Sequence, residues 1–215
     1  QWVMDAHSIG IDIGDDNDET GVIHSTNFAA DLLGPHEIET NLFTKAGPGP
    51  VTVETLALYS PEKPNDPARA GWYRYGNETT LNHLFDINSG EYQTLNPGIT
   101  GVTSFDPGPG SAFGFYSVWP FFGDRIVYTD NNLNTWDTTT GHHVRVYEYR
   151  DAGGNIVPNW YILATEEHTS GWDYNDIVLL VKNVQPTTSV ASGVIEITNP
   201  AWDMLLRDGG INGDG

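Results

Sequence analysis

The stretch His143-Val-Arg-Val-Tyr-Glu-Tyr149, followed by the turn Asp151-Ala-Gly-Gly-Asn155 and by residues 156–165, decides the fold class. Two runs rich in β-branched and aromatic residues flank a Gly-Gly turn, which is the pattern of a β-hairpin. Similar short runs, each bounded by Gly, Pro, Asn or Asp, recur at residues 51–59, 112–119, 125–129 and 177–181. The last run is apolar throughout, so we expect it to be a central strand. The sequence therefore predicts an all-β fold, an antiparallel, jelly-roll-like β-sandwich with short helices and long loops.

Composition excludes several classes of function. The chain has 215 residues, with 29 Asp and Glu against 9 Lys and Arg, and a formal net charge of −20. Such a surface repels phosphate backbones and anionic lipid, so we expect neither nucleic acid nor a membrane as partner. The absence of Cys excludes disulfides, thiol catalysis and Cys-based zinc sites.

The domain boundaries follow the turn chemistry. We expect residues 1–185 to form one sandwich domain, with residues 1–20 flexible and a short helix at 25–34. Residues 186–215 are expected to hold a linker that begins near Gln185, a terminal strand and a short helix. Whether this tail packs on the sandwich is left open by the sequence.

The segment Glu166–Asp176, directly before the apolar run 177–181, is the strongest candidate for a metal site. Calcium takes six to eight hard oxygen ligands, and this turn offers carboxylate and amide oxygens at neighbouring positions. We expect calcium to bind Asp173 and Asp176, with Glu166 as a further ligand. The alternative is a plain turn in which Asp and Asn side chains bond their own backbone.

Four segments resemble a known group of modules. Asp173-Tyr-Asn-Asp176-Ile-Val178 is similar to the D-[YF]-x-D-[VI]-V signature near the end of certain β-sandwich modules of secreted bacterial proteins. Residues 90–97, 105–116 and 128–134 match segments of the same group. These modules resemble the calcium-associated C-terminal domains of multidomain extracellular proteins with malectin-like, Ig-like or glycoside-hydrolase parts.

The resemblance implies a secreted, extracellular bacterial module within a larger protein, which binds calcium, glycan or both and which we expect to be monomeric. It also implies Asp130 as a calcium ligand by position. At Thr129-Asp130-Asn131 the chain departs from the group's Thr-Glu-Asp pattern, so one carboxylate becomes an amide.

Aromatic residues near turns point to a polysaccharide as the partner, because sugar C–H faces stack on flat rings. The candidate ligand-binding residues share a position near turn residues or on an open strand face: Trp72, Tyr73, Trp136, Tyr147 and Trp172. Strand alternation puts Val144 and Val146 on one face and Arg145 and Tyr147 on the other, which is either a flat platform or a buried face. The same rings could equally fill a core.

These observations predict a non-catalytic, calcium-stabilised carbohydrate-binding module. Two alternatives stay open: a structural or adhesion module in which calcium only stabilises the fold, and a polysaccharide lyase or hydrolase. No G-x-S-x-G, H-E-x-x-H or phosphate-binding Gly-rich loop occurs in the sequence. Glu166 and Glu167, taken as neighbours on one strand, would face opposite ways and make a poor catalytic pair.

Overall fold

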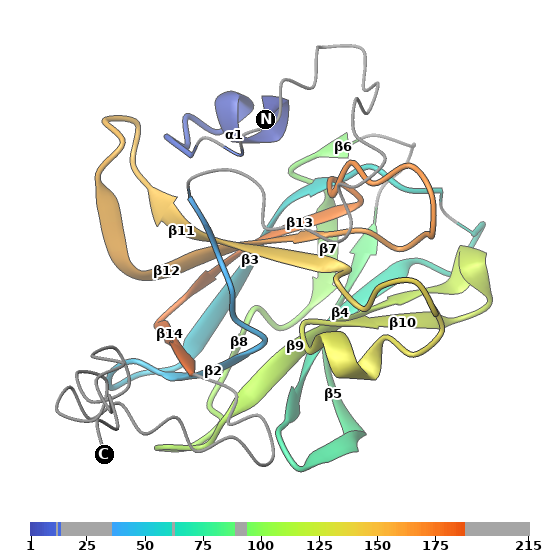
Figure 1. Cartoon of the computed structure of the whole chain (residues 1–215), viewed down its shortest axis with the longest axis horizontal. Helices are drawn as coiled ribbons and strands as arrows, with labels where there is room; N and C mark the ends of the chain where they lie inside the picture. Colours follow the sequence, from blue (N-terminus) through green and yellow to red (C-terminus); the bar gives the residue numbers. More distant parts are fainter. Residues whose placement is uncertain (12, 14–35, 62, 89–93, 188–215) are drawn as a thin grey trace, which may run out of the picture.

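The computed structural model describes residues 1–11, 13, 36–61, 63–88 and 94–187 and consists of two curled antiparallel sheets packed face to face (Figure 1). The first sheet has the order β1-β11-β12-β13-β3-β6, with β8 also paired to β3. Its strands are β1 (Glu37–Ile38), β3 (Val51–Leu58), β6 (Thr94–Leu95), β8 (Ser104–Phe105), β11 (Val144–Arg150), β12 (Ile156–Thr165) and β13 (Ile177–Lys182).

The second sheet has the order β14-β2-β9-β4-β5-β7, with β10 also paired to β9. Its strands are β2 (Leu42–Lys45), β4 (Ala68–Arg74), β5 (Asn77–Asn88), β7 (Gly98–Gly101), β9 (Phe113–Trp119), β10 (Arg125–Tyr128) and β14 (Val184–Thr187). Helical structure is limited to α1 (Trp2–Ala6) and two 3-10 turns, η1 (Pro120–Phe122) and η2 (Asn131–Leu133), among the described residues. None of these helices has the length and apolar character that crossing a membrane requires.

The predicted all-β sandwich is confirmed, and so are its decisive elements. The hairpin around the Gly-Gly turn forms β11 and β12, and the apolar run 177–181 forms β13 between β12 and β3. Residues 185–187, which the sequence placed at the start of a linker, continue from Val184 as β14 and pair with β2, and Val184 is buried in the core between the sheets. The predicted helix at 25–34 and the predicted elements after Thr187 lie outside the described residues.

The outer face of the first sheet is covered by the N-terminal segment rather than open. Val3, Met4, Ile9 and Ile11 pack with Tyr147 and its neighbours on β12 and β13 in a second apolar cluster. Figure 1 shows α1 lying over this sheet. Burial of both faces explains why β13 is apolar along most of its length.

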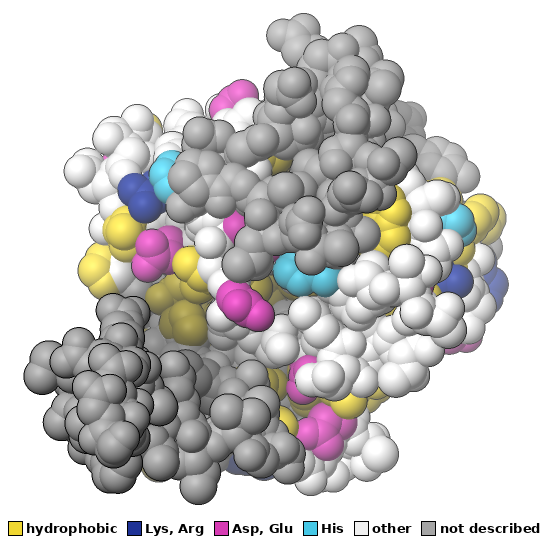
Figure 2. Space-filling model, in the orientation of Figure 1, with side chains coloured by type: hydrophobic (Ala, Val, Ile, Leu, Met, Phe, Trp, Pro, Cys, Tyr) yellow, Lys and Arg dark blue, Asp and Glu magenta, His cyan; other side chains and the backbone are white. Residues whose placement is uncertain are grey.

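The outer face of the second sheet carries a third cluster in which Tyr73 is fully buried. Gly114 on the neighbouring strand makes room for its phenol, since a Cβ at that position would collide with the Tyr73 hydroxyl. Exposed acids, by contrast, lie in separate patches on the face shown in Figure 2.

Candidate metal centre

The loop between β12 and β13 brings three carboxylates together. The two strands pair up to Thr165 and Ile177, and the eleven-residue span between them folds back so that residues near its two ends meet. The Glu167 amide donates to Asp176 Oδ2 at 3.0 Å, and the Asp176 amide donates to Thr165 O at 3.2 Å. Positive φ angles at Gly171, Trp172 and Tyr174 allow the chain to reverse inside this span.

The acidic triad consists of Glu166, Glu167 and Asp176. One carboxylate oxygen from each lies within 4.8 Å of the others, and the three residues are 3%, 3% and 6% exposed. Buried charges of the same sign in such proximity are unfavourable unless a cation or protons neutralise them. The triad is therefore the place in the described structure where a bound cation would have the greatest effect.

Hydrogen bonds orient the triad and leave one oxygen without a partner. Glu166 accepts from the amides of His168 at 3.0 Å and Asp173 at 3.2 Å, which fixes both of its oxygens. Glu167 Oε1 accepts from the Ser60 hydroxyl at 2.8 Å. Glu167 Oε2 is buried and has no hydrogen-bond partner. A buried carboxylate oxygen in that state leaves room for one more partner, a cation or a proton shared with the Asp176 carboxyl, because buried polar atoms are nearly always satisfied.

The electrostatics of the loop show the same lack of compensation. Burial raises the pKa of Glu166 to about 9, and the charges of Glu167 and Asp173 add to the effect. Burial also raises the pKa of Asp176 well above its usual range, and that of Asp173 to about 6. Among the described residues, no Lys, Arg or His forms a salt bridge with any of the four acids.

Two basic groups, Arg125 and His143, contact the backbone of the triad and not its carboxylates. Arg125 donates to the backbone carbonyl of Glu167 at 2.6 Å, and not to its carboxylate. His143 contacts the backbone carbonyl of Glu166 with Nδ1 and Asp137 with Nε2, and burial lowers its pKa. Neither group supplies the charge that the triad lacks.

The residues present fit a hard divalent cation. All three side chains offer carboxylate oxygens, the ligands preferred by Ca²⁺, Mg²⁺ and Mn²⁺. Oxygens on opposite sides of a calcium ion, at about 2.3–2.6 Å from it, would be about 5 Å apart, which accommodates the 4.8 Å span of the triad. Because three protein ligands leave positions free, backbone carbonyls or water would complete the shell. The donor set alone does not select calcium among these ions.

The sequence-predicted ligands divide into three groups. Glu166 and Asp176 belong to the triad, and Asp173 lies next to it through its amide. Asp130 lies outside the triad, where its carboxylate caps η2 by accepting from the Asn132 amide at 3.0 Å. Glu167 was not predicted as a ligand. The strand ends at Thr165, so the alternation that would have turned Glu167 away does not apply to it.

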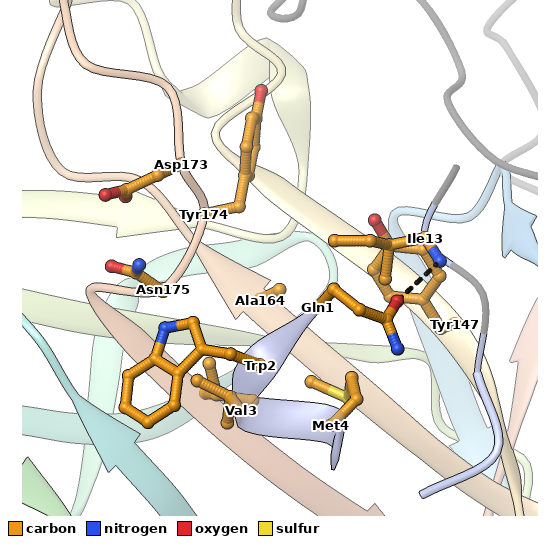
Figure 3. Close-up of a pocket in the computed structure, with 11 residues that line it drawn as sticks. Gln1, Trp2, Val3, Met4, Ile13, Tyr147, Ala164, Asp173, Tyr174 and Asn175 are labelled. Carbon is orange, nitrogen blue, oxygen red and sulfur yellow. Dashed lines mark hydrogen bonds between the residues drawn. The ribbon is translucent and has the colours of Figure 1, made fainter. Parts of the chain in front are cut away.

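The part of the loop directly before Asp176 lies beside the N-terminal helix (Figure 3). Asp173, Tyr174 and Asn175 line a small cavity beside Trp2, with a volume of about 30 Å³. Since one water needs about 10–15 Å³ in this measure, the cavity has room for two or three water molecules. Asn175 Oδ1 is buried there without a partner, so the space suits water rather than a larger ligand.

The predicted sugar-stacking rings do not form one surface. The expectation of an exposed ring is wrong for Tyr73, which packs behind Gly114, and for Tyr147, which the N-terminal segment covers. Trp72 is half-buried and stacks on Phe105, with ring centroids 4.6 Å apart. Their positions give no support to a shared platform for a polysaccharide.

Trp136 and Trp172 pack against His143, whose ring contacts the backbone carbonyl of Glu166. Both rings contact His143, with centroid distances of 4.1 and 5.1 Å, and the Arg125 guanidinium lies 4.3 Å from the centroid of the Trp136 ring. Both tryptophans are half-buried. These ring contacts hold His143 in place, and His143 in turn holds the backbone of Glu166 through a hydrogen bond. The two adjacent histidines turn apart, since His142 contacts Glu37 instead, at 3.0 Å.

Comparison with known proteins adds no further constraint: no family model, no curated protein and no solved structure matches this chain.

Proposed function

We propose that this chain is a non-catalytic β-sandwich module stabilised by a divalent cation, calcium by preference, at Glu166, Glu167 and Asp176. The observation that carries the proposal is the buried Glu167 Oε2, which lacks a partner within a triad of uncompensated carboxylates. The ion supplies positive charge at the junction of β12 and β13. The protein side chains hold it, and the Glu166 and Ser60 hydrogen bonds keep the carboxylates in place.

Burial also supports a non-catalytic role. General acid–base chemistry on a polysaccharide needs carboxyl groups that reach the scissile bond, about 5–10 Å apart on either side of it. The three acids are at most 6% exposed, so a polymer cannot approach them. Raised pKa values here are explained by burial and mutual repulsion without any catalytic role.

Glycan binding through the predicted rings has less support than a structural ion. Two of the five rings are buried, and the other three are packed against neighbours. The ion is therefore proposed as a structural component of the module rather than as a bridge to a sugar at these rings. The extracellular setting inferred from the resemblance remains part of the proposal, because calcium is abundant there.

Thermal unfolding in calcium and in chelator tests the function. An ion that binds only the folded state stabilises it by RT ln(1 + [L]/Kd), about 2.7 kcal/mol at a hundred times Kd. The melting temperature should therefore rise in calcium, and Glu167→Gln should remove most of that rise. Glu39→Gln, which alters an exposed carboxylate, is the matched control and should keep it. Equal melting temperatures with and without the ion would refute the proposal.

A further inference from the structure

The N-terminal segment (residues 1–11) is held on the first sheet by side-chain packing and by tertiary hydrogen bonds. Val3 and Met4 are 3% and 4% exposed and belong to the apolar cluster of the outer face. Beyond the helix, the Gly10 amide donates to the Arg150 carbonyl at 3.1 Å. The helix α1 has only five residues, too few to stay helical by itself in water. The segment therefore keeps its structure only while it is docked on the sheet.

Trp2 connects this segment to the metal centre through the turn that follows β3. Its ring packs edge-on against the Tyr59 ring, with centroids 4.7 Å apart. The Tyr59 amide donates to the backbone carbonyl of Asp176 at 2.9 Å. The hydroxyl of the next residue, Ser60, donates to Glu167 Oε1 at 2.8 Å. The turn that supports the Trp2 ring is thus bonded to two members of the acidic triad.

The second surface beside Trp2 is the loop between β12 and β13. Asp173, Tyr174 and Asn175 line one small cavity together with Trp2 (Figure 3). The Asp173 amide donates to Glu166 Oε2 at 3.2 Å, and the residue after Asn175 is itself a member of the triad. Both surfaces on which Trp2 rests are therefore parts of the structure that holds the three carboxylates.

A bound ion would stabilise this form of the loop. The three carboxylates lie within 4.8 Å of one another and repel unless protons or a cation neutralise them. The loop also holds Trp172 and Tyr174 at φ angles of 32° and 51°, a region that residues other than glycine rarely adopt. A proton bridges at most two oxygens, whereas a calcium ion fixes all three side chains to one point. Without the ion, we expect the loop to relax and the surfaces under Trp2 to relax with it.

We propose that calcium at the triad and the docking of residues 1–11 stabilise each other, so that the N-terminal segment is a calcium-dependent cover of the first sheet. The inference rests on the metal centre proposed above. Because such coupling is reciprocal, the factor by which calcium favours docking is also the factor by which docking raises the calcium affinity. Loss of calcium should uncover Tyr147, Ile162 and Val178, which share the apolar cluster with the segment and are at most 2% exposed. The segment thus converts calcium concentration into exposure of an apolar surface.

Amide hydrogen exchange of the whole chain, followed by NMR in calcium and in chelator, tests the docking. The Gly10 amide is the reporter, because its bond to the Arg150 carbonyl exists only in the docked state. We expect chelator to speed exchange of this amide at least about ten-fold through local opening. The amides of β9 (Phe113–Trp119), in the second sheet, should remain protected, which shows that the metal-free protein is still folded.

Calorimetric titration with calcium tests the reciprocal effect. Trp2→Ala removes the ring that contacts Tyr59 and leaves every hydrogen bond of the triad in place, so the calcium affinity should fall about five-fold or more. Because Trp2 is 40% exposed, its loss leaves the core between the sheets intact. Tyr75→Ala removes an exposed ring at the β4–β5 turn, far along the chain from the segment, and is the matched control that should keep the affinity.

The outcomes separate this inference from the metal centre on which it rests. Calcium that binds the unchanged protein without slowing exchange at Gly10, or that binds Trp2→Ala with equal affinity, would overturn the coupling and leave the metal centre standing. Failure of calcium to bind the unchanged protein would overturn both.

Discussion

At the scale of single residues, the metal centre predicts that Asp176→Asn has opposite effects in two conditions. In chelator, the amide removes one buried acid from a group of like charges, and its oxygen still accepts from the Glu167 amide, so the free energy of unfolding should rise by about 1 kcal/mol. In calcium the variant should be the less stable protein, because an ion ligand is lost. Urea unfolding in both conditions measures this reversal. A variant that is destabilised equally in both would show that Asp176 acts only through packing.

The raised pKa values predict the pH dependence of the metal-free protein. The folded-state pKa of Glu166 is raised from 4.5 to about 9, and that of Asp173 from 3.8 to about 6. At a pH between the unfolded-state and the folded-state pKa of either group, the folded state holds a proton that the unfolded state has released. The free energy of unfolding therefore falls as pH rises through that range. The contribution is complete below pH 4 and is lost by pH 9 or so. Urea unfolding at several pH values after removal of metal should show this decline.

Calcium should reverse that trend, since the ion displaces the same protons. Apparent calcium affinity should rise with pH over this range, and binding should release protons into a weakly buffered solution. Metal-free protein whose stability increases from pH 5 to pH 8 would contradict the assigned environment of Glu166.

At the scale of elements, the N-terminal segment is predicted to be part of the folded domain. Met4 is 4% exposed and packs in the cluster that also holds Tyr147. Met4→Ala should therefore lower the free energy of unfolding by about 2–3 kcal/mol. Asp5→Ala, on the exposed side of α1, should change it by less than about 0.5 kcal/mol. Urea denaturation distinguishes the two. Equal effects would mean that the segment does not pack on the sheet in solution.

The N-terminal segment also shows where sequence reasoning stops. Alternation along residues 143–149 separates the face of Val144 and Val146 from that of Arg145 and Tyr147, and the structure has these faces. What covers the second face is a segment some 140 positions earlier in the chain, a contact that local periodicity does not contain. For the same reason, Tyr73 next to a turn looked like an exposed ring. Its burial depends on Gly114 in a neighbouring strand.

At the scale of the whole molecule, turn spacing and strand composition were sufficient for the fold class, because β-strands and their turns leave local patterns. Sequence patterns identified only part of the metal centre. Asp176 and Glu166 follow from the density of oxygen donors before β13, but Glu167 depends on where β12 ends. Asp130 was inferred by resemblance, and the structure uses it as a cap. Glu167 was missed because Glu166 and Glu167 were treated as strand neighbours, although β12 ends at Thr165.

The net charge of −20 allows a specific ion to be separated from general screening. Sodium chloride should raise the melting temperature by reducing repulsion between surface acids, and the Debye length at about 1 M is near 3 Å. The additional rise caused by calcium should persist at that ionic strength, because the triad is buried and poorly screened. Melting curves in sodium chloride with calcium or chelator test this. A calcium effect that disappears at high salt would indicate diffuse binding to surface carboxylates.

The most direct test of the central claim is a crystal structure of the protein grown with calcium, with anomalous scattering measured to identify the ion. We expect one ion bound by Glu166, Glu167 and Asp176, with oxygen distances of about 2.3–2.6 Å and Glu167 Oε2 among its ligands. Water or shared protons between these carboxyls, with no anomalous peak at saturating calcium, would contradict it.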